Sequence, residues 1–237
     1  MPVVWVLLPA LNEEEGIKNT IRKIPESQIN ALGFEVKVLV IDGRSSDRTV
    51  EISLSEGAEV LVQNGPKGKG TGVREAFQNL IERSTKGDLV CMMDADGTYP
   101  PILIPEICEN LGQYQVVMGS RLRGRISKGS MSRVNYLGNY ILSMFASLVN
   151  LKRTTDVCTG LWGFRAEILQ QIVPNSNGFT VEAELFTRIC RNKLEIKEIP
   201  SDYSNRDGES HLIWYLDGPK IFLSLLKMRL QKMRGGR

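Results

Sequence analysis

The sequence has 237 residues, 42% of them hydrophobic and 24% charged, with a formal net charge of +3. This is the composition of an ordinary globular protein, and the charge is too small to indicate nucleic-acid binding. The four cysteines lie far apart in sequence, which excludes the paired spacing of a zinc site or a redox disulfide. We therefore expect a cytosolic protein with reduced thiols, and the length favours one large domain.

Strand and helix patterns alternate in the first half of the chain. Residues 3–8 are apolar but lack the basic lead-in and cleavage site of a signal peptide, so they predict a strand. Isoleucines at helical spacing follow a loop in which Asn12 is expected to cap the helix. More strands are expected at residues 34–41, 58–62, 88–93 and 114–121, with helices between them. This alternation predicts an α/β fold with a mostly parallel central sheet flanked by helices.

Two aspartates end the central strand pattern. Asp94 and Asp96 follow the nearly apolar run 88–93 and precede a Gly/Pro turn. In open α/β sheets, ligands bind at the carboxyl ends of the strands, and an Asp-x-Asp pair there offers the oxygen ligands that Mg²⁺ or Mn²⁺ prefers. The alternative is a solvated pair that caps the next helix, and the short motif alone does not decide.

The second half is less regular. No charged residue occurs between Val134 and Leu151, but asparagines interrupt this segment, so we expect a buried or interface-lying helix and not a membrane span. Residues 156–165 predict a turn or short strand, 181–191 a helix and 194–203 a strand. After Asp217 the chain has no acidic residue, and Phe222 and Leu226 are expected on the apolar face of a basic amphipathic helix. Such a helix either lies on an anionic bilayer or packs on the protein body.

Several features fail as familiar motifs. The glycine cluster at residues 65–72 lacks the order of a phosphate-binding loop because Lys69 precedes Gly70, although it still suits an anion at a helix start. His211 is the only histidine, which excludes a catalytic triad with a spare base and leaves a loop hydrogen bond as the expected role. Glu182 and Glu184 lie two residues apart on a helix, hence on different faces, and are not expected to act as a glycosidase pair.

In combination, six motifs resemble the inverting family 2 glycosyltransferases, in particular their dolichyl-phosphate mannosyltransferase-like branch. They are PALNEEE at residues 9–15, IDGRSSDRT at 41–49, GKG at 68–70, DADG at 94–97, GSR at 119–121 and TGLWGFR at 159–165. The resemblance implies a GT-A (nucleotide-diphospho-sugar transferase) fold, a Mg²⁺ or Mn²⁺ ion, a nucleotide-sugar donor and a polyprenyl phosphate acceptor. We expect the glycosyltransferase domain at residues 1–210 and a basic tail at 211–237.

The resemblance also implies a donor site. Pro9, Leu11 and Glu13 would line the nucleoside pocket, and Asp42 would help to recognise the base or ribose. The family often has a second Asp where this chain has Gly43, so the base, guanine or uracil, stays open. Two more residues of the matching motifs are expected at the donor: Lys69 and Ala95.

The phosphate and metal positions follow in the same way. Asp94 would lie near the ribose and the ion, and Asp96 would ligate the ion that bridges the diphosphate. Arg121 and Arg206 would hold phosphates of donor and acceptor, since guanidinium groups bind phosphate oxygens bidentately. The mannosyltransferases commonly have a metal-binding Gln where this chain has Thr98, which leaves the sugar open as well.

The implied reaction transfers a hexose from GDP-mannose or a UDP-hexose to polyprenyl or dolichyl phosphate by a single displacement. It would take place at the cytoplasmic face of a membrane that the protein touches peripherally, without nucleic acid as a partner. The alternative enzyme uses a saccharide or other hydroxyl acceptor with Glu182 or Glu184 as general base. A non-catalytic basic module would leave the two-carboxylate motif unexplained.

Overall fold

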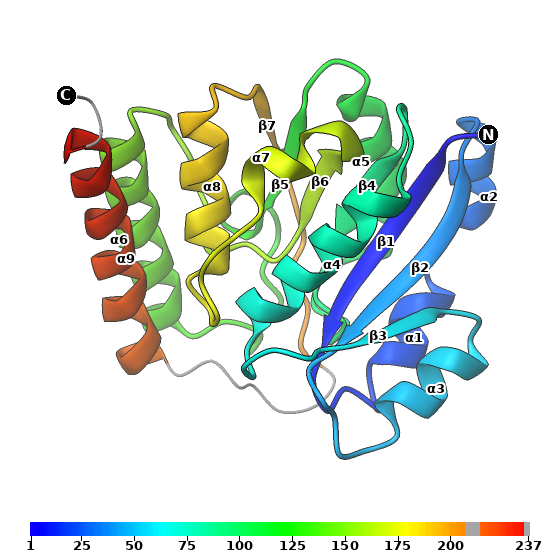
Figure 1. Cartoon of the computed structure of the whole chain (residues 1–237). Helices are drawn as coiled ribbons and strands as arrows, with labels where there is room; N and C mark the ends of the chain where they lie inside the picture. The colour runs from blue at the N-terminus through cyan, green and yellow to red at the C-terminus, as the bar shows by residue number, and fades with distance from the viewer. Residues whose placement is uncertain (207–213, 235–237) are drawn as a thin grey trace.

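The structure is a computed structural model that describes residues 1–206 and 214–234. One sheet runs through it, with the strand order β3-β2-β1-β4-β6-β5-β7 (Figure 1). All neighbouring pairs in this sheet are parallel except those that β6 makes with β4 and β5. The strands are β1 Val3–Ala10, β2 Glu35–Asp42, β3 Glu59–Val62, β4 Leu89–Met92, β5 Val116–Ser120, β6 Trp162–Arg165 and β7 Ile196–Pro200. The predicted mostly parallel α/β sheet is confirmed.

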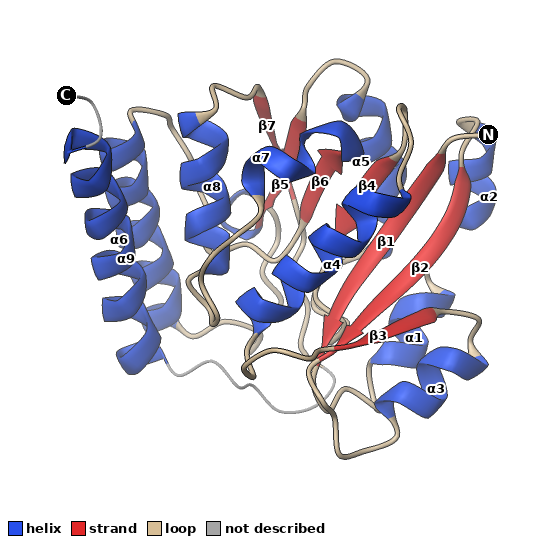
Figure 2. Ribbon diagram, viewed as in Figure 1, coloured by secondary structure: helices blue, strands red, loops and turns tan. Residues whose placement is uncertain are grey.

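Helices cover both faces of the sheet, as Figure 2 shows. They are α1 Ile17–Arg22, α2 Glu26–Ala31, α3 Thr49–Ser55, α4 Lys69–Arg83, α5 Ile104–Leu111, α6 Arg133–Asn150, α7 Leu169–Ile172, α8 Val181–Arg191 and α9 Trp214–Arg234. Along β1 the side chains alternate between two hydrophobic clusters, with Trp5 and Leu7 in one and Val6 and Leu8 in the other. The first cluster includes residues of α4, α7, α8 and α9, and the second includes residues of α1, α2 and α5.

The connection between β1 and α1 differs from the prediction. Asn12 does not cap α1, because the helix begins at Ile17 and its N-cap is Gly16. Asn12 has a φ of 54°, and its side-chain oxygen accepts a hydrogen bond from the backbone N–H of Ser46. The expected cap is therefore wrong, and the asparagine instead ties the loop after β1 to the loop after β2.

Helices α6 and α9 pack against each other at one end of the sheet (Figure 1). The uncharged segment forms α6 as expected, and its N-cap Ser132 accepts a hydrogen bond from the N–H of Asn135. Within residues 1–206 and 214–234, no helix is both long enough and apolar enough to cross a membrane. On α9, Phe222 and Leu226 of the expected apolar face are exposed, whereas their neighbours Ile221 and Leu225 are buried against the protein body.

Candidate active site

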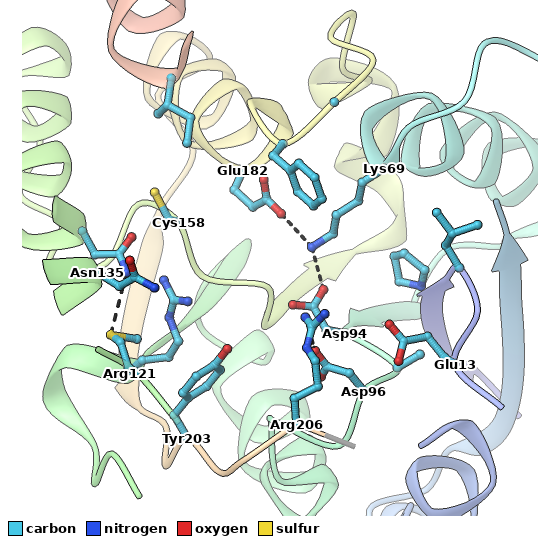
Figure 3. Close-up of a pocket in the computed structure, with 18 of the residues that line it drawn as sticks. Glu13, Lys69, Asp94, Asp96, Arg121, Asn135, Cys158, Glu182, Tyr203 and Arg206 are labelled. Carbon is cyan, nitrogen blue, oxygen red and sulfur yellow. Dashed lines mark hydrogen bonds and ion pairs between the residues drawn. The ribbon is translucent and has the colours of Figure 1, made fainter. Parts of the chain in front are cut away.

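A cavity of about 1060 Å³ opens where β1, β4 and β5 end. Its wall continues from these strand ends to the start of α4, the first half of α6 and the segment that ends at Arg206 (Figure 3). Parallel strands bring their carboxyl ends to one edge, so loops far apart in sequence meet here. Most residues expected at the site line this cavity: Pro9, Leu11, Glu13, Lys69, Asp94, Ala95, Asp96, Arg121 and Arg206.

Lys69 joins two acidic side chains from different elements. Its ammonium nitrogen lies 2.6 Å from a carboxylate oxygen of Asp94 and 2.7 Å from one of Glu182, at the start of α8 (Figure 3). Burial by itself would raise the pKa of Asp94, but the charges of Lys69 and Arg206 outweigh it and lower that pKa. Burial raises the pKa of Glu182, against the opposing effect of Lys69. Asp94 is therefore held ionised, with one oxygen already paired.

Asp96 has two carboxylate oxygens in different surroundings. Oδ1 accepts hydrogen bonds from the backbone N–H and the hydroxyl of Thr98, at 3.0 and 2.6 Å. Oδ2 is buried, accepts no hydrogen bond, and forms an ion pair with Arg206. Burial and the charge of Asp94 together raise the pKa of Asp96. Thr98 thus fixes the carboxylate, and only Oδ2 remains for a cation.

Glu13 adds a third carboxyl group to the same wall. Its backbone N–H donates to the hydroxyl of Thr49 at 2.8 Å, which fixes the loop after β1. Burial, followed by the charge of Asp96, raises the pKa of Glu13 to about 8. At neutral pH this side chain is therefore mostly a neutral acid that can donate a hydrogen bond to a ligand.

Arg121 lies in the cavity wall but is anchored from behind. Its guanidinium donates two hydrogen bonds of 2.7 Å to the carboxylate of Asp156, which is completely buried. The guanidinium carbon also lies 5.3 Å from the ring centre of Tyr203. Sequence reasoning did not find Asp156, because this contact joins residues 35 positions apart. The pairing holds the guanidinium in one orientation in the cavity wall.

Gly160 explains part of the TGLWGFR motif. A Cβ at this position would overlap Oδ2 of Asp94, so any other residue here would force the carboxylate or the backbone to move. Tyr99 holds the same backbone, since its hydroxyl accepts a hydrogen bond of 2.7 Å from the N–H of Gly160. The absent side chain therefore makes room for Asp94 in its observed position.

Three residues from the sequence analysis have other positions. Asp42 is buried, and its carboxylate accepts hydrogen bonds from the N–H groups of Arg44 and Ser45, while its neighbours Ile41 and Gly43 line the cavity. Glu184 accepts hydrogen bonds from the backbone of residues 175 and 176 and from Arg188, so Glu182 is the glutamate of the pair that lines the cavity. His211 lies outside the described residues.

Protein side chains alone do not supply a full set of metal ligands in the described part of the chain. Among the described residues, no three or more His, Cys, Asp or Glu side chains form a group that could hold a metal ion. Asp96 Oδ2 is nevertheless a carboxylate oxygen, the kind of ligand that a hard cation prefers, and it accepts no hydrogen bond although Arg206 forms an ion pair with it. Mg²⁺ is commonly held by one or two carboxylates together with substrate phosphates and water, and this arrangement fits that pattern.

Comparison with known proteins decides the family. Residues 5–173 match the model of Glycosyl transferase family 2, which is more than half of the chain. The protein is a family 2 glycosyltransferase.

Relatives in this family extend the match. Glycosyltransferase AglJ of Haloferax volcanii is 33% identical over 227 residues, which cover 94% of this chain and 71% of that protein. The dolichyl-phosphate hexose transferase of the same organism is 31% identical, and the match covers 96% of this chain and 94% of that protein. A solved structure of glucosyl-3-phosphoglycerate synthase from Mycobacterium tuberculosis, with Mn²⁺, UDP and glucosyl-3-phosphoglycerate, has a TM-score of 0.72. It is 22% identical, with 96% of this chain and 80% of that chain covered, and supports the GT-A fold of this family 2 enzyme.

Proposed function

We propose that this family 2 glycosyltransferase transfers a hexose from a nucleotide-diphospho-sugar, GDP-mannose or a UDP-hexose, to the phosphate of a polyprenyl or dolichyl phosphate. The observation that carries the proposal is the cavity wall, where Asp94 and Asp96 face Lys69, Arg121 and Arg206. These cations suit the phosphates of a donor and of an acceptor in one site. A relative named dolichyl-phosphate hexose transferase supports the acceptor.

Asp96, with Asp94 beside it, would hold a Mg²⁺ or Mn²⁺ ion. Such an ion stabilises the negative charge of the departing nucleoside diphosphate. Thr98 keeps the Asp96 carboxylate in a fixed orientation, and Lys69 keeps Asp94 ionised. Pro9, Leu11, Glu13 and Ala95 would contact the nucleoside, while Asp42 would shape the neighbouring loop through its backbone hydrogen bonds.

The chemistry asks little of a general base. A phosphate monoester is already anionic near neutral pH, so its oxygen attacks the anomeric carbon directly and the sugar's bond to the diphosphate breaks. Arg121, oriented by Asp156, and Arg206 would offset the repulsion between the two phosphate groups. Holding the reactants in line is then the main task of the protein.

Helices α6 and α9 would give access to a lipid acceptor. Apolar side chains of α6 are exposed in one stripe at helical spacing: Val134, Leu137, Ile141, Met144 and Leu148. Val134 also lines the cavity, and Phe222 and Leu223 extend the apolar surface on α9. We place this surface on the cytoplasmic face of a membrane, as a peripheral contact.

Vesicle binding tests this placement. Leu148→Gln combined with Leu137→Gln should weaken co-sedimentation of the protein with vesicles that contain anionic lipid. Leu54→Gln is the control, because Leu54 is the same residue type and is 56% exposed, close to the 57% of Leu137, but lies on α3. Equal binding by all three proteins would contradict the placement.

The alternative is transfer to a hydroxyl acceptor with Glu182 as general base. Glu182 lines the cavity but already pairs with Lys69, which favours a structural role. Glu182→Gln should therefore leave a substantial part of the turnover with a phosphate acceptor. Collapse of turnover in this variant, with an unchanged melting temperature, would favour the hydroxyl-acceptor enzyme.

The proposed function is tested by product analysis. The purified protein is incubated with polyprenyl phosphate and a panel of GDP- and UDP-sugars, with and without Mn²⁺, and the lipid fraction is analysed by mass spectrometry. We expect a hexosyl phosphate lipid from one donor, dependent on Mn²⁺ and absent with Asp96→Ala. No glycolipid from any donor would refute the proposal.

A further inference from the structure

Asp96 Oδ2 is a buried carboxylate oxygen that accepts no hydrogen bond. Thr98 donates twice to the other oxygen of Asp96, and Lys69 lies 2.6 Å from Asp94 Oδ1. Oδ2 has an ion pair with Arg206 in place of a hydrogen bond. Any cation that binds this carboxylate must therefore share Oδ2 with Arg206 or displace the guanidinium from it.

Arg206 is brought to this oxygen by an anchored segment. The backbone N–H of Tyr203 donates to the carbonyl of Arg125 at 2.8 Å, and the N–H of Ser127 donates back to Tyr203 at 2.9 Å. The next residue, Ser204, donates to the carbonyl of Thr98 at 2.9 Å. These bonds hold the chain two residues before Arg206 beside the loop that carries Asp96. The backbone around Arg206 therefore positions its side chain for the ion pair with Asp96.

The neighbouring carboxylates favour a cation such as Arg206 beside Asp96. Glu13, Asp94 and Asp96 face the same part of the cavity (Figure 3), and Lys69 is shared between Asp94 and Glu182. Arg206 is then the cation that balances Asp96 when no donor is bound. Its side chain is 25% exposed and lines the cavity, so it has space to move toward a ligand.

We infer that Arg206 competes with the divalent ion for Asp96 Oδ2, so that the ion binds tightly only together with a nucleoside diphosphate. The diphosphate supplies further oxygen ligands to the ion and a new anionic partner to the displaced guanidinium. This inference rests on the metal-dependent transfer proposed above. It gives Arg206 a second role, as the residue that couples metal binding to donor binding.

Coupling of this kind is reciprocal. If the nucleotide tightens Mn²⁺ binding, then Mn²⁺ tightens nucleotide binding by the same factor. Removing the guanidinium should strengthen the binding of Mn²⁺ alone, because Oδ2 is no longer occupied. It should also reduce the factor by which the nucleotide tightens Mn²⁺ binding, because no guanidinium then competes with the ion for Oδ2.

Electron paramagnetic resonance of free Mn²⁺ measures this directly, without turnover. The proteins compared are the wild type, Arg206→Gln, Arg206→Lys and the control Arg125→Gln, whose side chain is exposed in the loop that pairs with the Tyr203 segment. Each is titrated with Mn²⁺ alone, with Mn²⁺ and GDP, and with Mn²⁺ and UDP. Melting curves establish that all four are folded.

We expect Arg206→Gln to bind Mn²⁺ alone about tenfold more tightly than the wild type, with a smaller enhancement by nucleotide. Arg206→Lys should bind Mn²⁺ nearly as the wild type does, because it keeps a cation beside Asp96. Arg125→Gln should also resemble the wild type, because the substitution leaves Arg206 and Asp96 in place. Unchanged or weaker Mn²⁺ binding by Arg206→Gln, with nucleotide-dependent binding in the wild type, would overturn the inference and leave the proposed function intact. Absence of Mn²⁺ binding in every protein, with or without nucleotide, would overturn both.

Discussion

Replacement of Lys69 by methionine tests how the cavity wall is held together. Methionine keeps an unbranched side chain of similar length and removes the charge together with the N–H group that donates to Asp94. In the wild type the ammonium lies within 2.7 Å of oxygens of both Asp94 and Glu182. The lysine and glutamate side chains are only 13% and 8% exposed, so water cannot replace the lost cation fully.

The expected loss of stability is large. Removing one partner of a buried ion pair costs about 3 to 5 kcal/mol, because the remaining charges stay buried without compensation. For a chain of this size, such a loss lowers the melting temperature by roughly 6 to 20 °C. Without Lys69 the pKa of Asp94 rises above its value in the unfolded chain, and the pKa of Glu182, which burial already raises, rises further. The native variant then retains protons that the unfolded chain releases, and its deficit should grow as the pH rises from about 5 to 8.

Denaturant unfolding at several pH values measures both effects. Lys67→Met is the matched control, because Lys67 is exposed in the loop just before α4, two residues from Lys69, and also lines the cavity. The double variant Lys69→Met with Glu182→Gln should regain part of the loss, since one buried carboxylate is removed. Equal stability of Lys69→Met and Lys67→Met, or a deficit that shrinks as the pH rises, would refute the reasoning.

Three further variants probe single contacts of the site. Gly160→Ala should lower kcat by about 100-fold, because the added Cβ displaces the Asp94 carboxylate; near wild-type kinetics would contradict this. Glu13→Gln should leave stability unchanged near pH 4 and raise it by roughly 2 kcal/mol at pH 9. The sign follows because the pKa of Glu13 rises from 4.5 to about 8 on folding, so the wild type loses stability across that interval; parallel pH profiles in urea unfolding would refute it. Arg121→Lys should lose about 2 kcal/mol in thermal melts, because an ammonium cannot make both hydrogen bonds to Asp156, and an unchanged melt would contradict this.

Local patterns were sufficient for the central part of the fold. The apolar run before Asp94 predicted the buried strand β4, and parallel strand ends placed Asp94, Asp96 and Arg121 at one edge. Burial on both faces gives such strands a signal that does not depend on their neighbours. The six-residue helix α2 was not predicted, because Ile29 is its only buried residue and one apolar position gives no helical repeat.

The side-chain partners could not be predicted. Asp156 binds Arg121 across 35 positions, and Lys69 reaches Glu182 from another helix, so no local spacing indicates either pair. On α9, adjacent apolar residues at 221 and 222, and again at 225 and 226, allow two orientations of the helix. Packing against α6 and α8 selects Ile221 and Leu225 as the buried pair.

The most direct test of the proposed reaction compares two acceptors that differ only in the phosphate. The wild-type protein, Mn²⁺ and the active donor are incubated with polyprenyl phosphate or with the polyprenol of the same chain length, and transfer of labelled hexose to each lipid is measured. The account predicts transfer to the phosphate and none to the alcohol. Arg121 and Arg206 suit an anionic acceptor, and the alcohol would need a strong general base. Comparable transfer to polyprenol, or transfer to polyprenol alone, would contradict the account.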